Sequence, residues 1–169
     1  MIDSAPLPIV LDTSVWINVL STGHAKQIVE AIGSLIYVPE QVLDEIKLNP
    51  RDRRPFHPNP HPALESKHAL LVSLAPKELE TFLELVGASA PDRLGDGEAA
   101  SIAIALNRKC QLGVDERKAN RIIRERFSSI STFRSTDFLT HPSIRETLGA
   151  DLATECYELA VRFGRMHVL

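Results

Sequence analysis

The stretch Ile9-Val10-Leu11-Asp12 places a carboxylate directly after a short apolar run. The stretch Gln111-Leu112-Gly113-Val114-Asp115 repeats the pattern in the second half of the chain. Short apolar runs bounded by helical or turn-like sequence are typical of buried strands. Because open parallel sheets bind ligands beyond the carboxyl ends of their strands, both stretches predict an acidic binding edge.

The rest of the sequence also shows the alternating strand and helix patterns of a protein built on a parallel sheet. Five short apolar segments are predicted as strands, at 9–11, 35–38, 70–74, 112–114 and 130–133. Seven helical patterns accompany them, at 14–20, 25–32, 40–47, 77–86, 97–109, 116–127 and about 150–163. This alternation predicts an α/β fold, a three-layer α/β/α sandwich with a short, mostly parallel central sheet.

Composition narrows the class of protein. With 169 residues and 44% hydrophobic content, the chain is expected to form one domain over residues 1–169. No apolar run approaches the ~18 residues that span a bilayer, and the start lacks the pattern of a signal peptide, so we expect a cytoplasmic protein. Cys110 and Cys156 match no metal-ligand spacing and are expected to be buried free thiols. The net charge of −3 gives no overall electrostatic attraction for nucleic acid, so any such binding depends on local basic patches.

Residues 49–62 are rich in proline, histidine and arginine and show no periodicity. Their prolines exclude a helix or a central strand, so the segment is predicted to be a surface loop. His57 and His61 have a spacing that would bind metal on a helix, but the intervening prolines forbid that helix.

A third acidic candidate lies in the helix predicted over 40–47. Its buried stripe consists of Val42, Leu43 and Ile46. At ~100° per residue, Glu45 lies along the border of that stripe and can reach inward, whereas Asp44 points away. A solvated helical glutamate is the alternative.

Asp96 and Glu98 open a helix that is apolar almost all round, which indicates that its acidic start lies near the core. The two side chains are ~200° apart on a helix and point to nearly opposite sides. We assign the helix cap to Asp96 and the site to Glu98. The alternative gives both to capping and to the helix dipole.

Asp12 and Asp115 also have a structural alternative, because each could cap the helix that follows it. For Asp12, the neighbours Thr13 and Ser14 compete for that position. Carboxylates repel one another when a fold gathers them into one low-dielectric place, so such a place usually holds a cation. Together the acids predict a metal-dependent enzyme.

Four motifs carry a resemblance to a known family: Ile9-Val10-Leu11-Asp12-Thr13-Ser14; Val38-Pro39 with Val42-Leu43-Asp44-Glu45-Ile46; Gly97-Glu98-Ala99-Ala100-Ser101-Ile102-Ala103-Ile104-Ala105; and Gly113-Val114-Asp115-Glu116-Arg117-Lys118-Ala119. In this order, over residues 9–121, they resemble the PIN-domain nucleases. The resemblance is greatest to the bacterial and archaeal group related to VapC-type toxins. The loop at 49–62 and the last helix lie outside it.

The resemblance implies an acidic pocket that binds Mg²⁺ or Mn²⁺ and cleaves RNA. The implied pocket carboxylates are Asp12, Glu45, Glu98 and Asp115, with Asp96 as a further catalytic candidate. Asp12, Asp115 and Glu98 would ligate metal, and Thr13 or Ser14 would place a hydroxyl beside it. Glu98 stands where aspartate is common in the family, so the choice between Asp96 and Glu98 stays open.

The chemistry suits these residue types, because Mg²⁺ prefers hard oxygen ligands and keeps several waters. One such water would attack phosphorus, and the sequence leaves one ion or two open. An acidic pocket also needs cations at its rim to capture a phosphate backbone. Arg117 and Lys118 are the first candidates, within an exposed stripe that continues through Arg121 and Arg124; the loop arginines Arg51, Arg53 and Arg54 form a second patch.

The toxin resemblance implies two protein partners. One is a small antitoxin whose tail covers the pocket, and the other is a second copy of the chain in a homodimer. Both partners follow from the resemblance alone, because no residue pattern of this chain predicts them.

Two other function classes use the same acids. A phosphoacceptor signalling domain would bind Mg²⁺ at the strand ends, but Thr13 and Ser14 follow Asp12, and Arg134 stands where such domains place a lysine. Ser14 likewise disfavours an Asp-x-Asp phosphatase. A catalytically inactive PIN module that only binds RNA or protein is the remaining alternative.

Overall fold

A parallel sheet forms the centre of the protein. The computed structural model describes residues 6–56 and 60–168. Its five strands are β1 (Ile9–Leu11), β2 (Ile36–Pro39), β3 (Ala69–Val72), β4 (Gln111–Gly113) and β5 (Thr132–Phe133). They pair in the order β3-β2-β1-β4-β5, and every pairing is parallel. The predicted strands and the predicted three-layer α/β/α class are confirmed.

Helices occupy both faces of this sheet. They are α1 (Thr13–Ser21), α2 (Ala25–Ile32), α3 (Glu40–Glu45), the 3-10 helix η1 (Pro62–Leu64), α4 (Pro76–Val86), α5 (Asp96–Arg108), α6 (Arg117–Arg126), α7 (Ser135–Leu139), α8 (Pro142–Leu148) and α9 (Ala150–Phe163). All seven predicted helices are present. The sequence analysis missed η1, α7 and α8 because segments of 3, 5 and 7 residues are too short to display a helical period.

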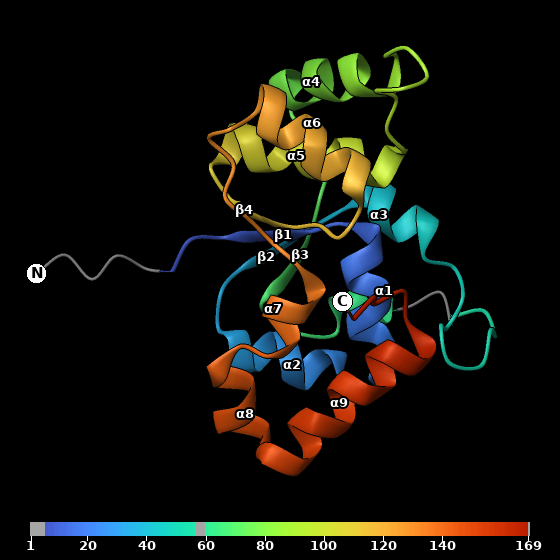
Figure 1. Cartoon of the computed structure of the whole chain (residues 1–169), viewed down its shortest axis with the longest axis vertical. Helices are drawn as coiled ribbons and strands as arrows, with labels where there is room; N and C mark the ends of the chain where they lie inside the picture. Colours follow the sequence, from blue (N-terminus) through green and yellow to red (C-terminus); the bar gives the residue numbers. More distant parts are fainter. Residues whose placement is uncertain (1–5, 57–59, 169) are drawn as a thin grey trace, which may run out of the picture.

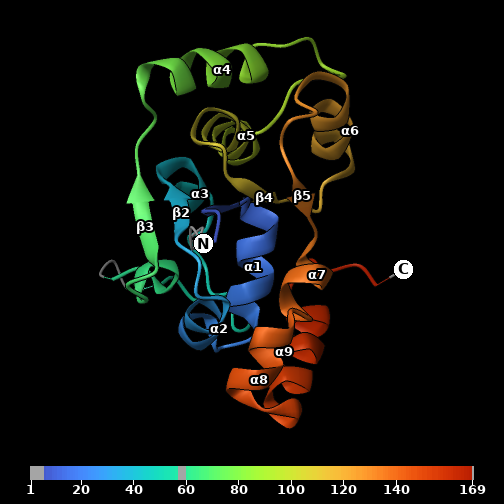
Figure 2. The same cartoon turned by 90° about the vertical axis from the view of Figure 1, so that its left-hand side faces the viewer.

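Two hydrophobic cores lie on the two sides of the sheet. Helices α4, α5 and α6 cover one face, and α1, α2, α7, α8 and α9 cover the other (Figures 1 and 2). The side chains of β1 alternate between them, since Val10 packs with α5 and α6 while Ile9 and Leu11 pack with the α1 side. Burial on both faces explains why β1 is a continuous apolar run.

The carboxyl ends of the strands meet at one edge, because all the pairings are parallel. Helix α1 begins directly after β1, α3 directly after β2, and Asp115 follows β4 by two residues. The strands β1, β4 and β5 pack tightly there: a Cβ on Gly113 would lie 2.7 Å from Phe133 Cε2 and 2.8 Å from Leu11 Cδ2. This close approach brings the segments after β1, β4 and β5 together.

The proline-rich loop is pinned by its own hydrogen bonds. Asn49 N–H donates to the Arg54 carbonyl at 2.8 Å, and Leu48 pairs with Pro55 in an isolated bridge. His61 caps η1, where its Nδ1 accepts from Ala63 N–H at 3.1 Å, and its Nε2 lies 2.9 Å from the Ile46 carbonyl. His61 therefore has a structural role, while His57 lies outside the described residues.

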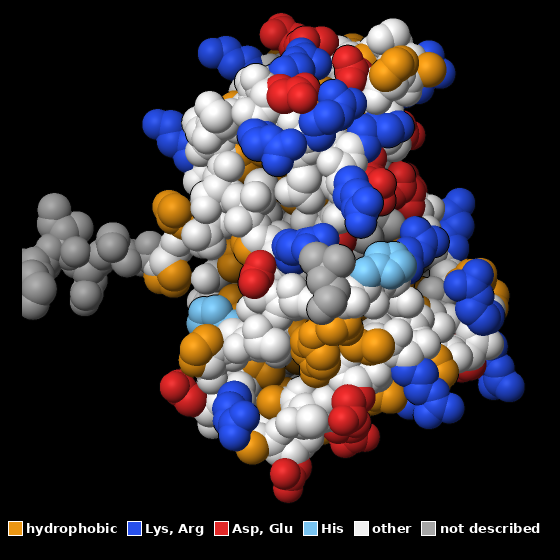
Figure 3. Space-filling view, viewed as in Figure 1, with side chains coloured by type: hydrophobic (Ala, Val, Ile, Leu, Met, Phe, Trp, Pro, Cys, Tyr) orange, Lys and Arg blue, Asp and Glu red, His pale blue; other side chains and the backbone are white. Residues whose placement is uncertain are grey.

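Buried thiols and surface charges follow the expected pattern. Cys110 and Cys156 are buried and free, as predicted, and burial raises the pKa of the Cys110 thiol to about 11. Lys and Arg side chains gather over α6 and over the loop after α3 on the face shown in Figure 3. None of the helices in the described ranges has both the length and the apolar character required to cross a bilayer.

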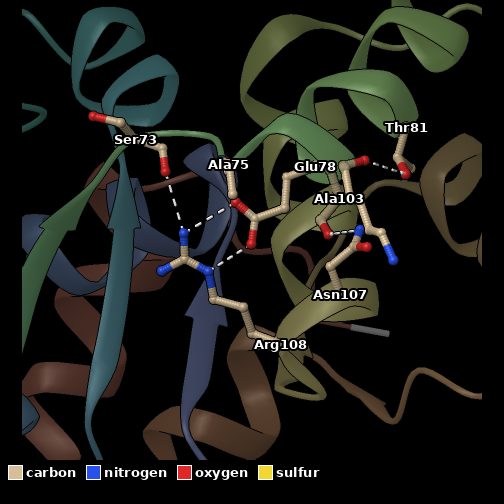
Figure 4. Close-up of polar contacts among 8 residues, drawn as sticks. Ser73, Ala75, Glu78, Thr81, Ala103, Asn107 and Arg108 are labelled. Atoms are coloured by element: carbon tan, nitrogen blue, oxygen red, sulfur yellow. Dashed lines mark hydrogen bonds and ion pairs between the residues drawn. The ribbon is translucent and has the colours of Figure 1, made fainter.

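An ion pair between the buried Glu78 and the partly buried Arg108 joins α4 to the end of α5 (Figure 4). Arg108 donates from Nε to Glu78 Oε1 at 2.6 Å and from Nη2 to Glu78 Oε2 at 3.0 Å, and Nη2 also reaches the Ser73 carbonyl at 3.2 Å. Glu78 is 2% exposed. Burial alone would raise its pKa, but hydrogen bonds from Arg108 and from Ala75 N–H hold the pKa below its ordinary value.

Replacing Glu78 tests this link. Glu78→Ala leaves Arg108 without its carboxylate in a desolvated place and removes the acceptor of Ala75 N–H, so we expect a loss of about 3 kcal/mol in the free energy of unfolding. Urea denaturation measures the loss. Glu80→Ala, an exposed residue of the same helix, is the control; equal losses for the two variants would contradict the role given to the ion pair.

Candidate functional site

A pocket of about 340 Å³ opens at the carboxyl edge of the sheet. Its acidic lining comes from four separate segments of the chain: Asp12, Glu45, Glu98, and the adjacent pair Asp115 and Glu116. The remaining lining residues are Thr13, Ser14, Gly95, Arg165 and His167. The fold therefore gathers Asp12, Glu45, Glu98 and Asp115, the four principal acids of the sequence analysis, around one pocket.

Asp12 caps α1 and lines the pocket at the same time. Its Oδ1 accepts hydrogen bonds from Val15 N–H at 3.0 Å and from the Ser14 hydroxyl at 2.8 Å. Its Oδ2 accepts no hydrogen bond from the part of the chain that the structure describes. The choice between a cap and a ligand is thus not exclusive, because each function can use a different oxygen.

The Asp115 carboxylate is held by hydrogen bonds from two residues that were not predicted from the sequence. Its Oδ1 accepts from Ser135 N–H at 2.8 Å, and its Oδ2 accepts from the Ser135 hydroxyl at 2.5 Å and from Asn18 Nδ2 at 3.1 Å. Asn18 and Ser135 are both fully buried. The residue that caps α6 is Glu116, so Asp115 does not serve as its cap.

Glu45 ties the end of α3 to the start of α5. Its Oε1 accepts from Gly97 N–H at 2.9 Å, and its Oε2 accepts a hydrogen bond from the Thr13 hydroxyl. A Cβ on Gly97 would clash with both Thr13 Oγ1 and Glu45 Oε2, so a larger residue here would displace the Thr13–Glu45 contact. Both Glu45 and Asp44 are exposed, but only Glu45 lines the pocket, the side to which its helical position points.

The capping role that we gave to Asp96 belongs to Glu98. The cap of α5 is Gly95, whose N–H donates to Glu98 Oε2 at 3.3 Å, while Asp96 is exposed and does not line the pocket. The assignment of the cap to Asp96 was therefore wrong, because a glutamate at the third helical position can reach back to the N–H before the helix. Glu98 does both jobs: it caps α5 and faces the pocket.

Burial and mutual repulsion perturb the acids of the pocket. Burial raises the pKa of Asp12 to about 7, and the charges of Asp115 and Glu98 add to the rise against the hydrogen bonds from Val15 and Ser14. Burial is also the main reason that the pKa of Glu98 is raised, with Glu116 and Glu45 contributing and Lys118 opposing. These effects show that the carboxylates act on one another in a poorly solvated place.

The basic residues of α6 lie beside the pocket and not within its lining. Lys118 Nζ donates to the Arg93 carbonyl at 3.1 Å, and Arg117 is exposed. The Arg121 side chain is 37% exposed, as the predicted stripe requires, but it pairs with Asp92 at 2.8 Å and with Glu125 at 3.1 Å. Hydrophobic periodicity places Arg121 on the outer face of the helix but cannot show which neighbour covers it.

Five residues of the site escaped the sequence analysis: Asn18, Glu116, Ser135, Arg165 and His167. The adjacent acids Asp115 and Glu116 at a strand end were a usable signal for one of them. The other four had none, because Asn18 lies inside an apolar helix and the last three come from the end of the chain.

The carboxylates do not form a ready-made ligand cage. No group of three His, Cys, Asp or Glu side chains within residues 6–56 and 60–168 is arranged to hold a metal ion by itself. The donor set is nevertheless all oxygen, and Mg²⁺ commonly binds through one or two carboxylates while its other positions hold water and substrate phosphate. The residues present therefore suit a hydrated Mg²⁺ or Mn²⁺.

Comparison with known families agrees with this geometry. A family model described as a PIN domain matches residues 8–127. The chain belongs to the PIN-domain family. This family has a nuclease-type fold, and the match covers β1 to α6, which supply Asp12, Glu45, Glu98 and Asp115. Comparison with curated proteins and with solved structures gave no match.

The end of this PIN domain also reaches the pocket. Ser135, Arg165 and His167 all lie beyond residue 127, where the family model stops. Asn18 links the two parts, since its Nδ2 donates to Asp115 and to Ser135 Oγ, and its Oδ1 accepts from Arg165 N–H at 2.6 Å. The segment after α6 is thus built into the site.

The raised pKa of Asp12 predicts a pH-dependent cost in stability. The folded state binds this proton more tightly than the unfolded chain, so the free energy of unfolding falls as the pH rises from 3.8 to about 7. Asp12→Asn stays neutral and keeps the capping oxygen. In EDTA at pH 8, we expect it to be more stable than the native chain by roughly 2 kcal/mol, with the difference vanishing near pH 4.

Thermal denaturation across this pH range makes the measurement, with the exposed Asp44→Asn as control. A stability difference between Asp12→Asn and the native chain that does not change with pH would contradict the cost of burying the Asp12 charge.

Proposed function

We propose that this PIN domain is a Mg²⁺- or Mn²⁺-dependent endoribonuclease that hydrolyses phosphodiester bonds of RNA. The observation that carries the proposal is the convergence of Asp12, Glu45, Glu98, Asp115 and Glu116 on one pocket. Such a cluster is costly, as the pKa of Asp12 shows, and a fold that retains it gains from a divalent cation. The PIN-domain match supports a nuclease reaction.

Asp12 and Asp115 are the residues proposed to hold the ion, with Glu98 beside them. Asp12 Oδ2 is free of hydrogen bonds from the described residues, and Asp115 is oriented by Asn18 and Ser135. When bound, a divalent ion supplies a water of lowered pKa and neutralises charge on the scissile phosphate.

The protein side chains then position the reactants. The Ser14 hydroxyl holds Asp12, and the hydrogen bonds from Thr13 and Gly97 hold Glu45 at the rim. The proton of the attacking water passes to Glu98 Oε1, since Oε2 already accepts the Gly95 N–H. A glutamate with a raised pKa is a better match to this task than an ordinary one, because a base works best near the ambient pH.

RNA cleavage tests the proposal. We expect the native chain to cut labelled single-stranded RNA in Mn²⁺ and not in EDTA. Asp12→Asn, Asp115→Asn and Glu98→Gln are expected to lose at least about 100-fold in rate, the size of a missing catalytic group. Asp96→Asn and Asp44→Asn, which remove exposed carboxylates outside the pocket, are expected to retain the rate.

The other function classes give different results in the same assay. Formation of an acyl phosphate without RNA cleavage would favour the phosphoacceptor signalling domain. RNA binding without cleavage in either metal would favour the inactive PIN module. Either result contradicts the ribonuclease proposal.

We further propose that this ribonuclease is a cytoplasmic toxin, held in check by a small antitoxin protein and acting as a homodimer. The motif resemblance to VapC-type toxins supports the first part. Exposed leucines on the edge strand β3 and on α4 support the dimer, since Leu70, Leu71, Leu79 and Leu83 are between 44% and 56% exposed.

Induced expression of the native chain is expected to arrest bacterial growth, and Asp12→Asn is expected not to. Co-expression of a short open reading frame beside the gene is expected to restore growth. Sedimentation velocity is expected to give a dimer that Leu79→Lys/Leu83→Lys converts to monomer. Unimpaired growth would contradict the toxin proposal, and a native monomer would contradict the dimer.

A further inference from the structure

A second pocket adjoins the acidic one. It has a volume of about 330 Å³ and lies between the loop after α3 and the end of α9. Glu45 and Arg165 line both pockets, so these two residues form the border between them. A chain that passes through the acidic pocket can therefore continue directly into its neighbour.

The adjoining pocket is lined by three cationic side chains. Lys47, Arg53 and Arg165 line it, and within the described residues none of their side chains forms an ion pair. Other arginines of the protein are committed to structure, as Arg108 is to Glu78 and Arg121 is to Asp92. Three unpaired cations in one concave place are a site for a multiply charged anion.

The walls of this pocket are fixed. Arg51 holds the loop against the body of the protein: its guanidinium carbon lies 5.8 Å from the centre of the Phe163 ring, and a Cβ on Gly23 would lie 2.6 Å from its Nη1. Arg53 N–H donates to the Asn49 carbonyl at 2.9 Å, which keeps the tip of the loop folded. The cations are thus held on an ordered scaffold.

The opposite wall is tied to the acidic pocket itself. Arg165 N–H donates to Asn18 Oδ1, and the amide of the same Asn18 donates to Asp115. Gly164 allows this approach, because a Cβ there would clash with Asn18 Oδ1. The backbone of Arg165 is therefore held in a set position relative to the pocket carboxylates, and its exposed side chain extends from that point.

We propose that the adjoining pocket binds the nucleotide next to the scissile phosphate of a single-stranded RNA, with Lys47, Arg53 and Arg165 contacting its phosphate. The proposal rests on the ribonuclease function given above. Recognition by charge gives the subsite no base preference. It explains how an acidic pocket captures a polyanion: the scissile phosphate lies at the carboxylates, and the next one lies among cations.

Binding, measured apart from cleavage, tests the subsite. All variants are made in the Asp12→Asn background, and a short fluorescein-labelled single-stranded RNA is titrated in Mg²⁺ and followed by anisotropy. We expect Lys47→Ala/Arg53→Ala to weaken binding about tenfold and to reduce the slope of log K against log salt by about 1.4, the value for two lost phosphate contacts.

Two controls separate charge at this pocket from charge in general. Lys26→Ala/Lys67→Ala removes the same charge from exposed positions that line neither pocket, and is expected to leave affinity and slope unchanged. Lys47→Arg/Arg53→Lys keeps the charge and is expected to retain binding. Thermal denaturation verifies that each variant is folded.

Unchanged affinity in a folded Lys47→Ala/Arg53→Ala variant would overturn the subsite, as would an equal loss in Lys26→Ala/Lys67→Ala. Neither result would affect the ribonuclease proposal, which depends on metal-dependent cleavage by the native chain. Conversely, RNA that binds through these cations but is never cut would contradict the ribonuclease proposal.

Discussion

The burial of the Asp12 carboxylate beside other acids is the constraint around which this site is built. Asp12 is 1% exposed, yet it shares its pocket with Glu45, Glu98, Asp115 and Glu116. A fold can hold such a group only if neutral donors fix each side chain. The Ser14 hydroxyl, the Asn18 amide, the Ser135 hydroxyl and the Gly97 N–H do this here.

Asn18 connects the two parts of the chain that form the site. It is buried in α1, and it bonds to Asp115 after β4, to Ser135 at the start of α7 and to Arg165 after α9. The PIN-domain match ends at residue 127, so this amide joins the matched region to the segment beyond it, as do the Ser135–Asp115 hydrogen bonds and the β4–β5 pairing. The acidic pocket thus takes its carboxylates from the matched region and its cation Arg165 from the segment beyond it.

The sequence predicted best those site residues whose place in the fold follows from the local pattern of apolar and polar residues. Asp12 and Asp115 follow apolar strands, and parallel pairing brings such strand ends together whatever the details of packing. Glu45 was predicted from the border of a helical stripe. The residue that caps α5 was harder to predict. Asp96 and Glu98 both suit the start of a helix, and which of them caps it depends on the backbone at Gly95.

The remaining site residues depend on contacts between distant segments, which local pattern does not encode. Ser135 and Arg165 are ordinary surface residue types in sequence, and they enter the site because α7 and the end of α9 pack beside α1. The pairing of Arg121 with Asp92 was missed for the same reason.

Anomalous diffraction from a crystal soaked in Mn²⁺ tests the central claim most directly. The account predicts a peak in the acidic pocket, ~2.2 Å from an oxygen of Asp12 and of Asp115, with water in the other positions. A peak elsewhere on the protein, or carboxylates that stay free of metal at saturating Mn²⁺, would contradict it.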